Sequence, residues 1–580
     1  MSSKHFINDP TKLVNTALQS LTYTNPNVAF DAENKIIYTR PKNSPEQVSI
    51  ISGGGSGHEP SFAAMVGPGM LSAAVAGTIF ASPSAEQVRT AIQARVDTGK
   101  GVLVVVMNYT GDILNFGMAV EKAKTAGLNV EMVVVGDDVG VGREKAGKVG
   151  RRGIAGTVLV LKVAGALAQA GRSLEEVAAV ARLAASNIVS VGASLEHVHV
   201  PGRVAETGEG LSLGEVEIGM GIHNEPGSAR EKIELPQLVE RMLAQLLDPN
   251  DKDRAFLNAD WKETVLLINN LGGVSVLEMG GITTEAVTQL ADKYKIRPVR
   301  VISGTFMTSL NGLGFSITLL NSVDTGIDGA RLVNLLDIPN EVTGWSAPIH
   351  AQTWAAGGSA TRTGALDRDQ KVEPSGLTLD AAQATAALTN ALKQVISAEP
   401  EITRYDTVVG DGDCGIGLKR GAEAVLKHIS QNPFTGDAVV DVASLVPVVE
   451  NNMDGTSGAL YAIFLNSLVQ SLRSLAPGES SPHLWSAALK LSCEALAKYT
   501  SAQPGDRTLI DALHPFVEQL GLTGDVKKAA EAARKAADGT KGMKASLGRA
   551  VYVGGSGHEE VPDPGAWGLA CFFSGLSDIN

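Results

Sequence analysis

Hydrophobic residues in the first half of the chain occur as short, nearly continuous runs that alternate with Ala-rich stretches. The runs at 48–52, 102–107 and 131–135 have the length and β-branched content of strands, and the stretches at 60–66 and 116–126 favour helices. A run that is apolar on both faces, such as Val102–Met107, is typical of a strand buried between two helix layers in a parallel sheet. The alternation therefore predicts an α/β domain.

A second set of strand patterns follows, at 264–269, 299–303 and 315–320. We therefore expect one α/β domain over 1–350 with two lobes, of about 1–195 and 196–350.

The pattern changes after residue 350. Residues 351–376 lose hydrophobic periodicity and contain Gly-Gly-Ser and Pro-Ser-Gly, which indicates a linker. Beyond it, apolar residues recur at three-to-four spacing, as in Leu388, Leu392, Val395 and Ile396. Residues 377–580 are therefore predicted to form an all-α bundle or barrel.

Composition and charge exclude several classes of protein. A chain of 580 residues is too long for one hydrophobic core, which agrees with several domains. The formal net charge of −13, without a run of five Lys or Arg, argues against nucleic acid or an anionic membrane as the main partner.

The three cysteines imply no disulfide framework. The N-terminus lacks the apolar core of a signal peptide, and no apolar run reaches transmembrane length. We therefore expect a cytoplasmic protein.

Three carboxylates, Asp406, Asp411 and Asp413, lie within eight residues of a chain that can bend at Gly410 and Gly412. Carboxylates this close repel one another, and Mg²⁺, which takes oxygen ligands, would offset the repulsion. A calcium EF-hand does not fit, because its twelfth loop position would be Gly or Ala rather than Glu. An acidic surface turn remains the alternative at this point.

Three predicted strand ends carry polar or Gly-rich segments. The first is the turn Ser52–Pro60 with His58 at its far end, the second is Asn108–Asp112, and the third is Gly136–Asp138. Ligands of α/β proteins bind at the carboxyl ends of strands, and bare glycine amides can approach a ligand closely. Each segment taken singly is equally well explained as a turn that the topology requires.

An isolated histidine, His223, lies in the segment 215–227 among Gly219, Gly221 and Gly227. We expect these glycines to clear room around its ring, which would suit a functional role, although a core or surface histidine is the usual explanation.

Three loops of the helical region could bind phosphate. Residues 453–458 precede a helix expected to begin at Ala459, so that hydroxyl side chains and free amides would lie at a helix N-terminus. Residues 505–508 are similar, and residues 562–565 could close over a nucleotide. Helix capping and turn formation explain each loop on its own.

The motifs together carry a resemblance. In order along the chain they are GGGSGHEP, NYTGD, GIHNEPG, the Asp406 loop, DGTSGALY and GDRT. The chain resembles the single-chain, ATP-dependent dihydroxyacetone kinases, also called glycerone or triose kinases. The resemblance covers nearly the whole length and implies a substrate domain followed by an all-helical nucleotide domain.

The resemblance implies a role for each residue of the substrate site. His223 would form a covalent hemiaminal with the carbonyl of dihydroxyacetone or glyceraldehyde, and Asp112 would act as general base on the attacking hydroxyl. His58 would hydrogen-bond the substrate. The lining would be formed by Gly55, Ser56, Gly57 and Met107.

The resemblance also implies two Mg²⁺ ions held by Asp406, Asp411 and Asp413, with ATP bound around them. The residues implied at the nucleotide are Asp411, Gly412, Asp413, Cys414, Thr456, Ser457, Thr500, Arg507, Thr508, Leu509, Asp563, Pro564 and Gly565. Closure of the helical domain over the substrate domain and a homodimer are expected from the same resemblance.

Two departures from the family pattern stand out. Met107 occupies a position where the family usually has a Lys that reaches toward the substrate, and a thioether cannot replace an ammonium. Residues 554–559 repeat the GGSGHE sequence without a βαβ context, so we assign His558 no catalytic role.

Two alternative functions remain. One is cyclising cleavage of FAD to a cyclic flavin phosphate at the same metal site, which the family suggests. The other is a non-enzymatic sensor of triose and nucleotide, which Met107 alone favours and which the base Asp112 and the acidic loop argue against.

Overall fold

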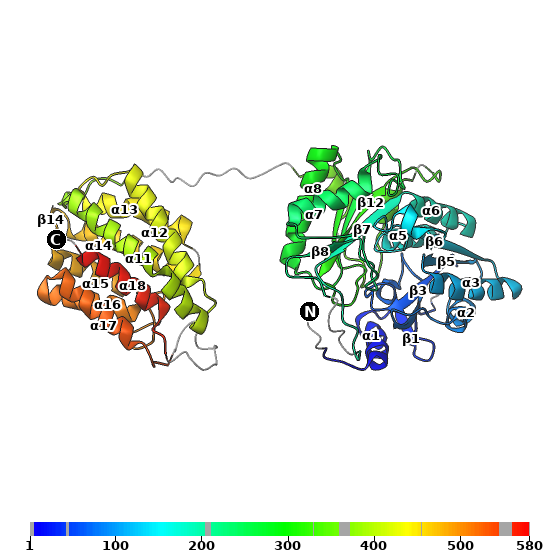
Figure 1. Ribbon diagram of the computed structural model, residues 1–580, viewed down its shortest axis with the longest axis horizontal. Coiled ribbons are helices and arrows are strands. Elements are labelled where there is room, and N and C mark those ends of the chain that lie inside the picture. The colour runs from blue at the N-terminus through cyan, green and yellow to red at the C-terminus, as the bar shows by residue number, and fades with distance from the viewer. Residues whose placement is uncertain are drawn as a thin grey trace. The chain divides into compact units, whose positions relative to one another are not determined.

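The chain forms two compact units, Met1–Ala360 and Thr361–Asn580. Figure 1 colours the first unit from blue to green and the second from yellow-green to red. The computed structural model describes residues 5–41, 46–203, 210–328, 330–347, 349–358, 372–453, 455–544 and 560–578. The units meet in sequence within the segment 351–376 predicted as a linker, which also contains the short helix α10 (Ala351–Ala356).

The first unit is built on two six-stranded sheets, of which the first has the order β1-β2-β4-β3-β5-β6. Its strands are β1 (Val28–Asp31), β2 (Ile36–Thr39), β3 (Ser49–Ser56), β4 (Ala73–Ile79), β5 (Val102–Met107) and β6 (Val130–Val135). β4, β3, β5 and β6 are parallel, which confirms the parallel arrangement predicted for β3, β5 and β6. β1 and β2 form an antiparallel edge that the sequence pattern did not predict.

Helices cover both faces of this sheet. α2 (Ala85–Ala94) and α3 (Thr110–Thr125) pack on one face, and α5 (Thr157–Gln169) and α6 (Leu174–Ser186) pack on the other. The helix predicted at 60–66 was wrong: only the single 3-10 turn η1 (Ala63–Met65) forms there. Gly67 and Gly69 with positive φ end this turn before a helix can extend.

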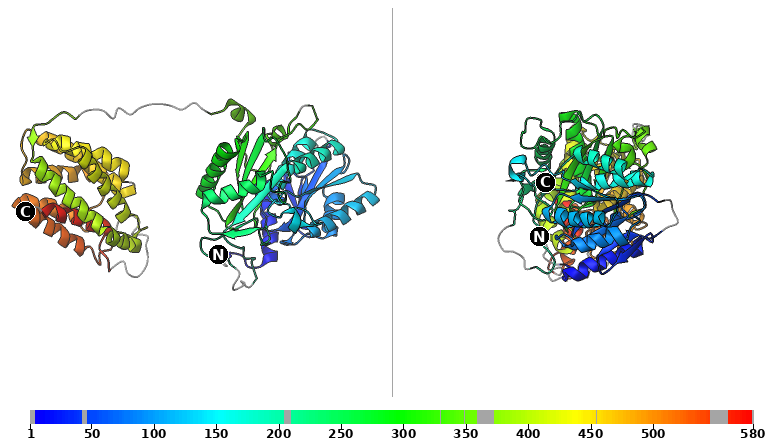
Figure 2. Two further views of the ribbon diagram at one scale, coloured as in Figure 1. Left: turned by 45° about the horizontal axis from the view of Figure 1, so that its top comes forward. Right: turned by 90° about the vertical axis from the view of Figure 1, so that its right-hand side faces the viewer.

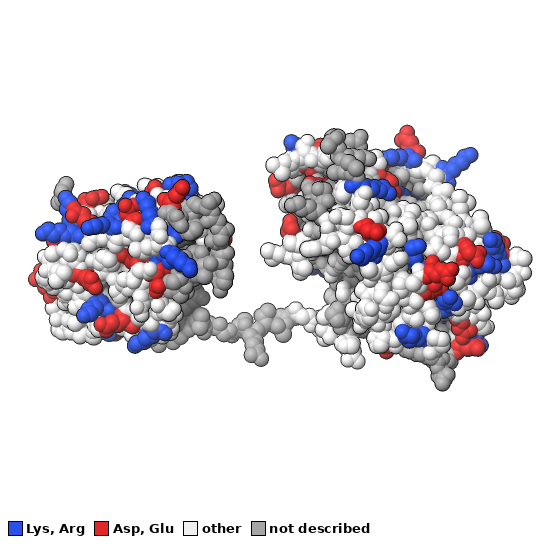
Figure 3. All heavy atoms as spheres, turned by 90° about the horizontal axis from the view of Figure 1, so that it is seen from below, with Lys and Arg blue, Asp and Glu red and all other residues white. Residues whose placement is uncertain are grey.

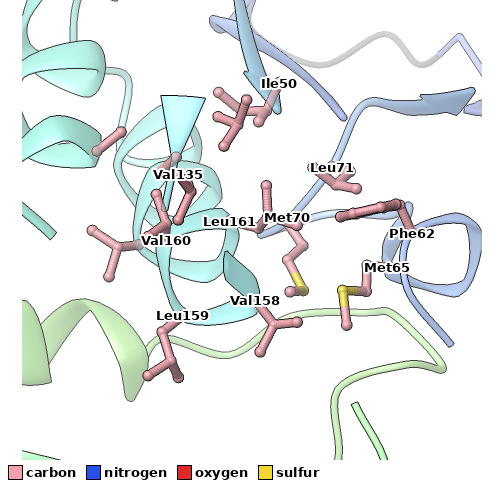
Figure 4. Packing of buried hydrophobic residues seen from close by; sticks show 14 of the residues in the cluster. Ile50, Phe62, Met65, Met70, Leu71, Val135, Val158, Leu159, Val160 and Leu161 are labelled. Atoms are coloured by element: carbon pink, nitrogen blue, oxygen red, sulfur yellow. The ribbon is translucent and has the colours of Figure 1, made fainter. Parts of the chain in front are cut away.

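The largest core of the first unit surrounds α5, in which every residue from Thr157 to Ala168 is buried. Figure 4 shows Val158 and Leu161 of α5 beside Met65 and Met70. The largely apolar character of α5 follows from its position between the two sheets, where no face meets solvent, and the buried Lys162 donates to the Leu335 carbonyl at 3.1 Å.

The second sheet has the order β11-β10-β12-β7-β8-β9. Its strands are β7 (Ile188–Ser194), β8 (Val216–Ile218), β9 (Ala229–Glu231), β10 (Thr264–Asn270), β11 (Arg300–Gly304) and β12 (Gly314–Asn321). Among these six strands, β10 and β11 pair in parallel and the other neighbours pair antiparallel. Figure 2 shows the later strands of this sheet in green. β7 precedes the lobe boundary expected near 195 but belongs to this sheet, because it pairs along its length with β12.

The described residues of the first unit form five further helices, which are α1 (Pro10–Thr24), α4 (Arg143–Ala146), α7 (Leu235–Leu247), α8 (Val276–Tyr294) and α9 (Leu332–Leu336). Of these, α7 and α8 pack against the second sheet on the side away from α5.

The described residues of the second unit form a ring of helices in which each packs on its neighbours in sequence and α18 packs on α11. The helices are α11 (Ala381–Val409), α12 (Cys414–Gln431), α13 (Ala438–Asn452), α14 (Gly455–Leu475), α15 (Pro482–Leu496), α16 (Ile510–Thr523), α17 (Val526–Gly539) and α18 (Pro564–Ser577). Two-residue strands β13 (Leu377–Thr378) and β14 (Gly478–Glu479) pair beside them. The ring surrounds an apolar cavity of about 640 Å³. The predicted all-helical barrel is thus confirmed apart from this small strand pair.

Lys, Arg, Asp and Glu side chains are interspersed on the faces visible in Figure 3. Among the described residues, no helix combines the length and the apolar composition needed to cross a bilayer.

Candidate active site

The carboxyl ends of β3, β4 and β5 lie at one edge of the first sheet, because these strands are parallel neighbours. β3 leads into the turn with His58, and β5 leads into α3, whose first turn carries Asp112. His223 comes from the loop between β8 and β9 of the second sheet. The three residues predicted to act on substrate are thus brought to one place by both sheets.

His58 and His223 face each other through their Nε2 atoms, which are 3.0 Å apart. The two rings are nearly perpendicular, with centroids 4.8 Å apart and an interplanar angle of 81°. His58 is fully buried, and its Nδ1 lies 2.8 Å from the carbonyl oxygen of Thr308. The side chain of His223 remains about 20% exposed, so a small molecule can reach its ring.

The hydrogen-bond partners of the two rings indicate which ring nitrogens donate and which accept. The Thr308 carbonyl only accepts, so Nδ1 of His58 donates, and Nδ1 of His223 donates to the Glu225 carboxylate at 2.9 Å. A hydrogen bond between the Nε2 atoms then needs a third proton. Burial, and next the charge of His223, lower the pKa of His58 to about 3, so His58 is neutral and its Nε2 can accept a hydrogen bond.

Glu225 belongs to a charged chain that reaches into the protein. Burial opposes its ionisation, but the hydrogen bonds from His223 outweigh this effect and lower the pKa of Glu225 to about 2. Its Oε2 lies 3.9 Å from Nη1 of Arg152, whose Nη2 donates to Oδ2 of the buried Asp138 at 2.6 Å. His223 is therefore held by a carboxylate that is itself anchored.

Asp112 has the properties of a general base. Its side chain is 4% exposed, and its Oδ1 has no hydrogen-bond partner among the described residues. Burial raises the pKa of the carboxyl from 3.8 to about 6, while a hydrogen bond with Ser82 and the charge of His223 act in the opposite direction. A buried carboxylate with one open oxygen and a pKa near the working range suits proton abstraction.

The Gly-rich turn is less open to a ligand than its sequence indicates. The N–H of Gly57 donates to Oε2 of Glu59 at 3.0 Å, and the hydroxyl of Ser56 donates to the Gly77 carbonyl at 2.9 Å. A Cβ on Gly55 would lie 2.7 Å from the backbone nitrogen of Ala81, so this glycine allows two segments to approach closely. The turn packs against the segment after β4.

Met107 and the glycines near His223 also differ from expectation. Met107 is buried in the main core, where its Cβ and Cγ lie against Gly153, and this packing gives a substrate contact no support. The prediction that glycines clear room around the His223 ring was wrong. A Cβ on Gly221 would meet the Glu225 carboxylate, and a Cβ on Gly227 would meet the Ile218 carbonyl, so these glycines make room for the loop itself.

In the second unit, carboxylate oxygens of Asp406, Asp411 and Asp413 lie within 4.8 Å of one another. Asp406 is buried in the last turn of α11, and the other two lie in the exposed turn before α12. Oδ2 of Asp406 accepts from the Cys414 N–H at 2.9 Å. Burial raises the pKa of Asp406, and the charges of its two neighbours raise it further.

This donor set fits Mg²⁺. Three carboxylates that converge from one helix end and one turn supply oxygen ligands to a hard cation, and their mutual repulsion is relieved when a cation binds. An acidic surface turn does not explain why Asp406 is buried beside the other two.

The predicted nucleotide residues gather around this trio. Ser457 lies in the first turn of α14, which begins at Gly455 rather than at Ala459, and its side chain hydrogen-bonds with Cys414. Thr456 is exposed in the same turn. Gly412 and Cys414 belong to the acidic turn itself and to the start of α12.

Two further predicted loops adjoin one another. Asp563 caps α18 by accepting from the Ala566 N–H at 2.7 Å, and burial raises its pKa to about 7. The charge of Asp406 also acts on Asp563, so α18 begins within electrostatic reach of the trio. A Cβ on Gly565 would lie 3.5 Å from the Cβ of Leu509. The loop that contains Pro564 and Gly565 therefore lies against the loop that contains Thr508 and Leu509.

Two predicted nucleotide residues have structural partners instead. The buried guanidinium of Arg507 donates to the carbonyls of Met543 and Val561 at 3.0 and 2.9 Å, and so fixes the segment before Asp563. Thr500 accepts from the Ala502 N–H at 3.2 Å within its own turn. The repeated GGSGHE sequence at 554–559 lies outside the described residues.

Several residues at these sites were missed from the sequence. Phe80, Ser82 and Tyr109 surround the histidines and Asp112; no motif marked Phe80 or Ser82, and Tyr109 lies in the NYTGD motif but was given no role. Glu225 could have been found, because an acidic residue two positions after a histidine can reach its ring. In the second unit, Trp567 Nε1 and the Tyr405 hydroxyl donate to the two oxygens of Glu401 at 3.0 and 2.6 Å and so join α18 to α11.

Comparison with known proteins assigns both units. A model of the Dak1 domain matches residues 19–343, and a model of the DAK2 domain matches residues 408–578. A Komagataella pastoris protein named dihydroxyacetone kinase is 43% identical over 608 residues, covering 100% of this chain and 98% of its own. A Homo sapiens protein named triokinase/FMN cyclase is 35% identical over 591 residues and 100% of both chains. The crystal structure of the dihydroxyacetone kinase from C. freundii in complex with AMP-PNP and Mg²⁺ matches with a TM-score of 0.65 and 32% identity over 100% of both chains.

Proposed function

This chain belongs to the dihydroxyacetone kinase family, and we propose that it transfers the γ-phosphoryl group of ATP to a hydroxyl group of dihydroxyacetone, with glyceraldehyde as a further substrate. The proposal is carried by one observation. An exposed imidazole nitrogen faces a second, neutral imidazole, and a buried base with an open oxygen lies within electrostatic reach.

Capture of the substrate begins at Nε2 of His223. His58 accepts a proton from this atom, and the freed Nε2 attacks the carbonyl carbon. His58 then returns the proton to the carbonyl oxygen, so that a neutral hemiaminal hydroxyl forms. The Nε2 atoms lie 3.0 Å apart, which allows the first transfer, and the lowered pKa of His58 favours the second, because a weakly basic imidazole gives its proton up readily. Glycerol has no carbonyl and cannot be held in this way.

Phosphorylation then uses Asp112. Its carboxylate accepts the proton of a substrate hydroxyl, the hydroxyl oxygen attacks the γ-phosphorus, and ADP leaves. Covalent attachment of a three-carbon sugar fixes the hydroxyl relative to the base, and fixed geometry of this kind can supply several kcal/mol of the barrier reduction.

ATP is bound by the second unit in this proposal. Asp406, Asp411 and Asp413 would hold magnesium, which would neutralise charge on the phosphate oxygens when bound. Amides and hydroxyls of Thr456 and Ser457 at the start of α14 bind phosphate, since a helix N-terminus attracts anions. The loops of Leu509 and Gly565 adjoin the trio and would contact the nucleoside.

Release of ADP from Mg-ATP in the presence of dihydroxyacetone tests the activity. We expect turnover with dihydroxyacetone and none with glycerol, and His223→Ala should lose it through a large rise in the KM for dihydroxyacetone. An active His223→Ala variant with an unchanged KM would contradict capture by this residue.

Capture can also be observed directly. With dihydroxyacetone labelled by ¹³C at its carbonyl carbon, the parent protein should convert the carbonyl signal into that of a tetrahedral carbon. The signal should be absent with His223→Ala and present with Asp112→Asn, since the base acts after capture.

A second candidate activity is cleavage of FAD to a cyclic flavin phosphate at the metal trio. It is supported by the 35% identity with the human protein named triokinase/FMN cyclase. This activity would need Mn²⁺ or Mg²⁺ but no carbonyl capture. FAD cleavage that persists in His223→Ala and disappears in Asp406→Asn would establish it.

Several expectations stay predictions. These are the second Mg²⁺ ion, the homodimer, the cytoplasmic location and the closure that brings ATP to the captured substrate. A single magnesium per chain in a metal titration with ATP would contradict the first.

A further inference from the structure

The segment from Phe80 to Ser82, which follows β4, touches every residue of the proposed substrate chemistry. The ring of Phe80 stacks on His58 with centroids 5.3 Å apart, and it meets the ring of His223 edge-on at 5.1 Å. Ser82 lies near Asp112 and lowers the pKa of its carboxyl. We infer that Phe80 is a positioning residue for carbonyl capture, which holds the rings of His58 and His223 so that their Nε2 atoms face each other.

The backbone of Phe80 supports this role. Its φ of 59° lies in the left-handed region, which large side chains rarely occupy. The Phe80 N–H donates to the Ser56 carbonyl at 2.9 Å, and this bond ties the strained residue to the Gly-rich turn. A left-handed backbone at a bulky residue persists only where its surroundings require it.

The Gly-rich turn is shaped to receive this residue. A Cβ on Gly57 would lie 2.7 Å from a ring carbon of Phe80, and a Cβ on Gly55 would lie 3.0 Å from its Cα. The glycines therefore admit Phe80, where the sequence alone had suggested that they admit a ligand.

Phe80 restricts a motion that would misdirect the nucleophile. His223 is bonded at Nδ1 to Glu225, and rotation of the ring about that bond would swing Nε2 away from His58. Phe80 and Tyr109 both lie perpendicular to the His223 ring, at 84° and 87°. With the ring confined, Nε2 stays within reach of a carbonyl carbon, which requires an approach of about 3 Å.

The inference rests on the proposed function, and matched variants test it. Phe80→Asn removes the ring and suits the left-handed backbone, because Asn tolerates that region. Phe80→Tyr keeps the ring. Loss of two aromatic contacts predicts a KM for dihydroxyacetone about tenfold higher in Phe80→Asn and within about threefold of the parent in Phe80→Tyr. The KM for Mg-ATP should not change in either variant.

The ¹³C adduct gives a readout that a general loss of structure would not imitate. In Phe80→Asn and in Phe80→Leu, about tenfold more labelled dihydroxyacetone should be needed to form the tetrahedral signal, at an unchanged melting temperature in at least one of them. If the parent and both variants need the same concentration of labelled dihydroxyacetone to form the tetrahedral signal, the inference about Phe80 is wrong and the proposed function still stands. A parent protein that forms neither adduct nor ADP would overturn the proposed function and this inference with it.

Discussion

The site of the first unit and that of the second differ in how their charges are balanced. Beside His223, a chain of charged groups is paired within the protein: Glu225 bonds to the ring, Arg152 lies beside Glu225, and Asp138 binds Arg152. In the second unit, three carboxylates converge within 4.8 Å, and burial adds to the repulsion at Asp406. The first site is therefore complete before substrate arrives, whereas the second depends on a cation.

This difference predicts how the function and the stability of the protein should respond when a charged group is removed from each site. A site balanced by its own residues should lose function and stability together when a partner is removed. A site that awaits a cation should lose function but gain stability when one of its charges is removed in the absence of metal. The following predictions separate these two behaviours.

The largest effect is expected for Asp112→Asn. An amide cannot accept the hydroxyl proton, so kcat should fall by about 10²- to 10⁴-fold. The KM for dihydroxyacetone should change little, because the proposed capture uses His223 and precedes the action of the base. Steady-state kinetics measure both constants, and a kcat within tenfold of the parent would show that another group is the base.

Asp406→Asn should lower kcat/KM for Mg-ATP by about 10²- to 10³-fold, as for loss of one charge-stabilising group at a phosphoryl site. The same variant should melt at a higher temperature than the parent in EDTA. Burial, and then the neighbouring carboxylates, raise the pKa of Asp406 in the folded state. The folded state therefore loses stability as the pH rises from the ordinary pKa of an aspartate through this raised pKa. The neutral amide of the variant avoids this loss.

Asp437→Asn provides the matched control for that stability measurement. Burial opposes ionisation of Asp437, but hydrogen bonds from Val440, Gly376 and Ser375 lower its pKa, so its charge stabilises the fold at neutral pH. The control variant should therefore melt lower than the parent. A lower melting temperature for Asp406→Asn as well would contradict the proposed repulsion.

Glu225→Gln should raise the KM for dihydroxyacetone about 10- to 100-fold, since a hydrogen bond to a charged group contributes about 1.5–3 kcal/mol. It should also lower the melting temperature, because Arg152 loses its second carboxylate. Glu121→Gln breaks only the exposed pair with Lys124 and should change neither quantity. If Glu225→Gln loses stability but keeps the KM of the parent, Glu225 does not contribute to carbonyl capture.

The pH dependence of kcat/KM should show one group with a pKa near 6. Burial raises the pKa of Asp112 from 3.8 to about 6, so the active carboxylate is lost as the pH falls below that value. The rate should then decline about tenfold for each unit of pH. The residual rate of Asp112→Asn should lack this pH dependence. If the variant has the same pH profile as the parent, another residue is the group that titrates near 6.

The smallest effect is expected for Trp567→Phe, which removes the bond to Glu401 but keeps an aromatic ring. Loss of one hydrogen bond between α18 and α11 should raise the KM for Mg-ATP by about threefold. Trp354→Phe in the first unit is the control and should leave this KM unchanged. An unchanged KM in both variants would show that α18 is held in place by packing alone.

Much of the architecture could be predicted from the sequence, and the candidate site residues stay predictions that rest on local motifs. Alternating apolar runs indicated the strands β3, β5 and β6, and three-to-four spacing indicated the helical second unit, because these patterns depend on local periodicity. His58, Asp112, His223 and the acidic trio were recognisable because each lies in a motif whose members are close in sequence.

Only the tertiary structure decided what surrounds those residues. His58 bonds to Thr308, 250 residues away, and faces His223, 165 residues away, and no local pattern records such pairings. Phe80 was missed for the same reason, since its importance arises where β4 ends beside the turn of β3 and the loop of β8. The environment of Met107 also depended on packing, because a strand end can direct its side chain into the core or toward a ligand, and here the close approach of Gly153 fills the space beside it.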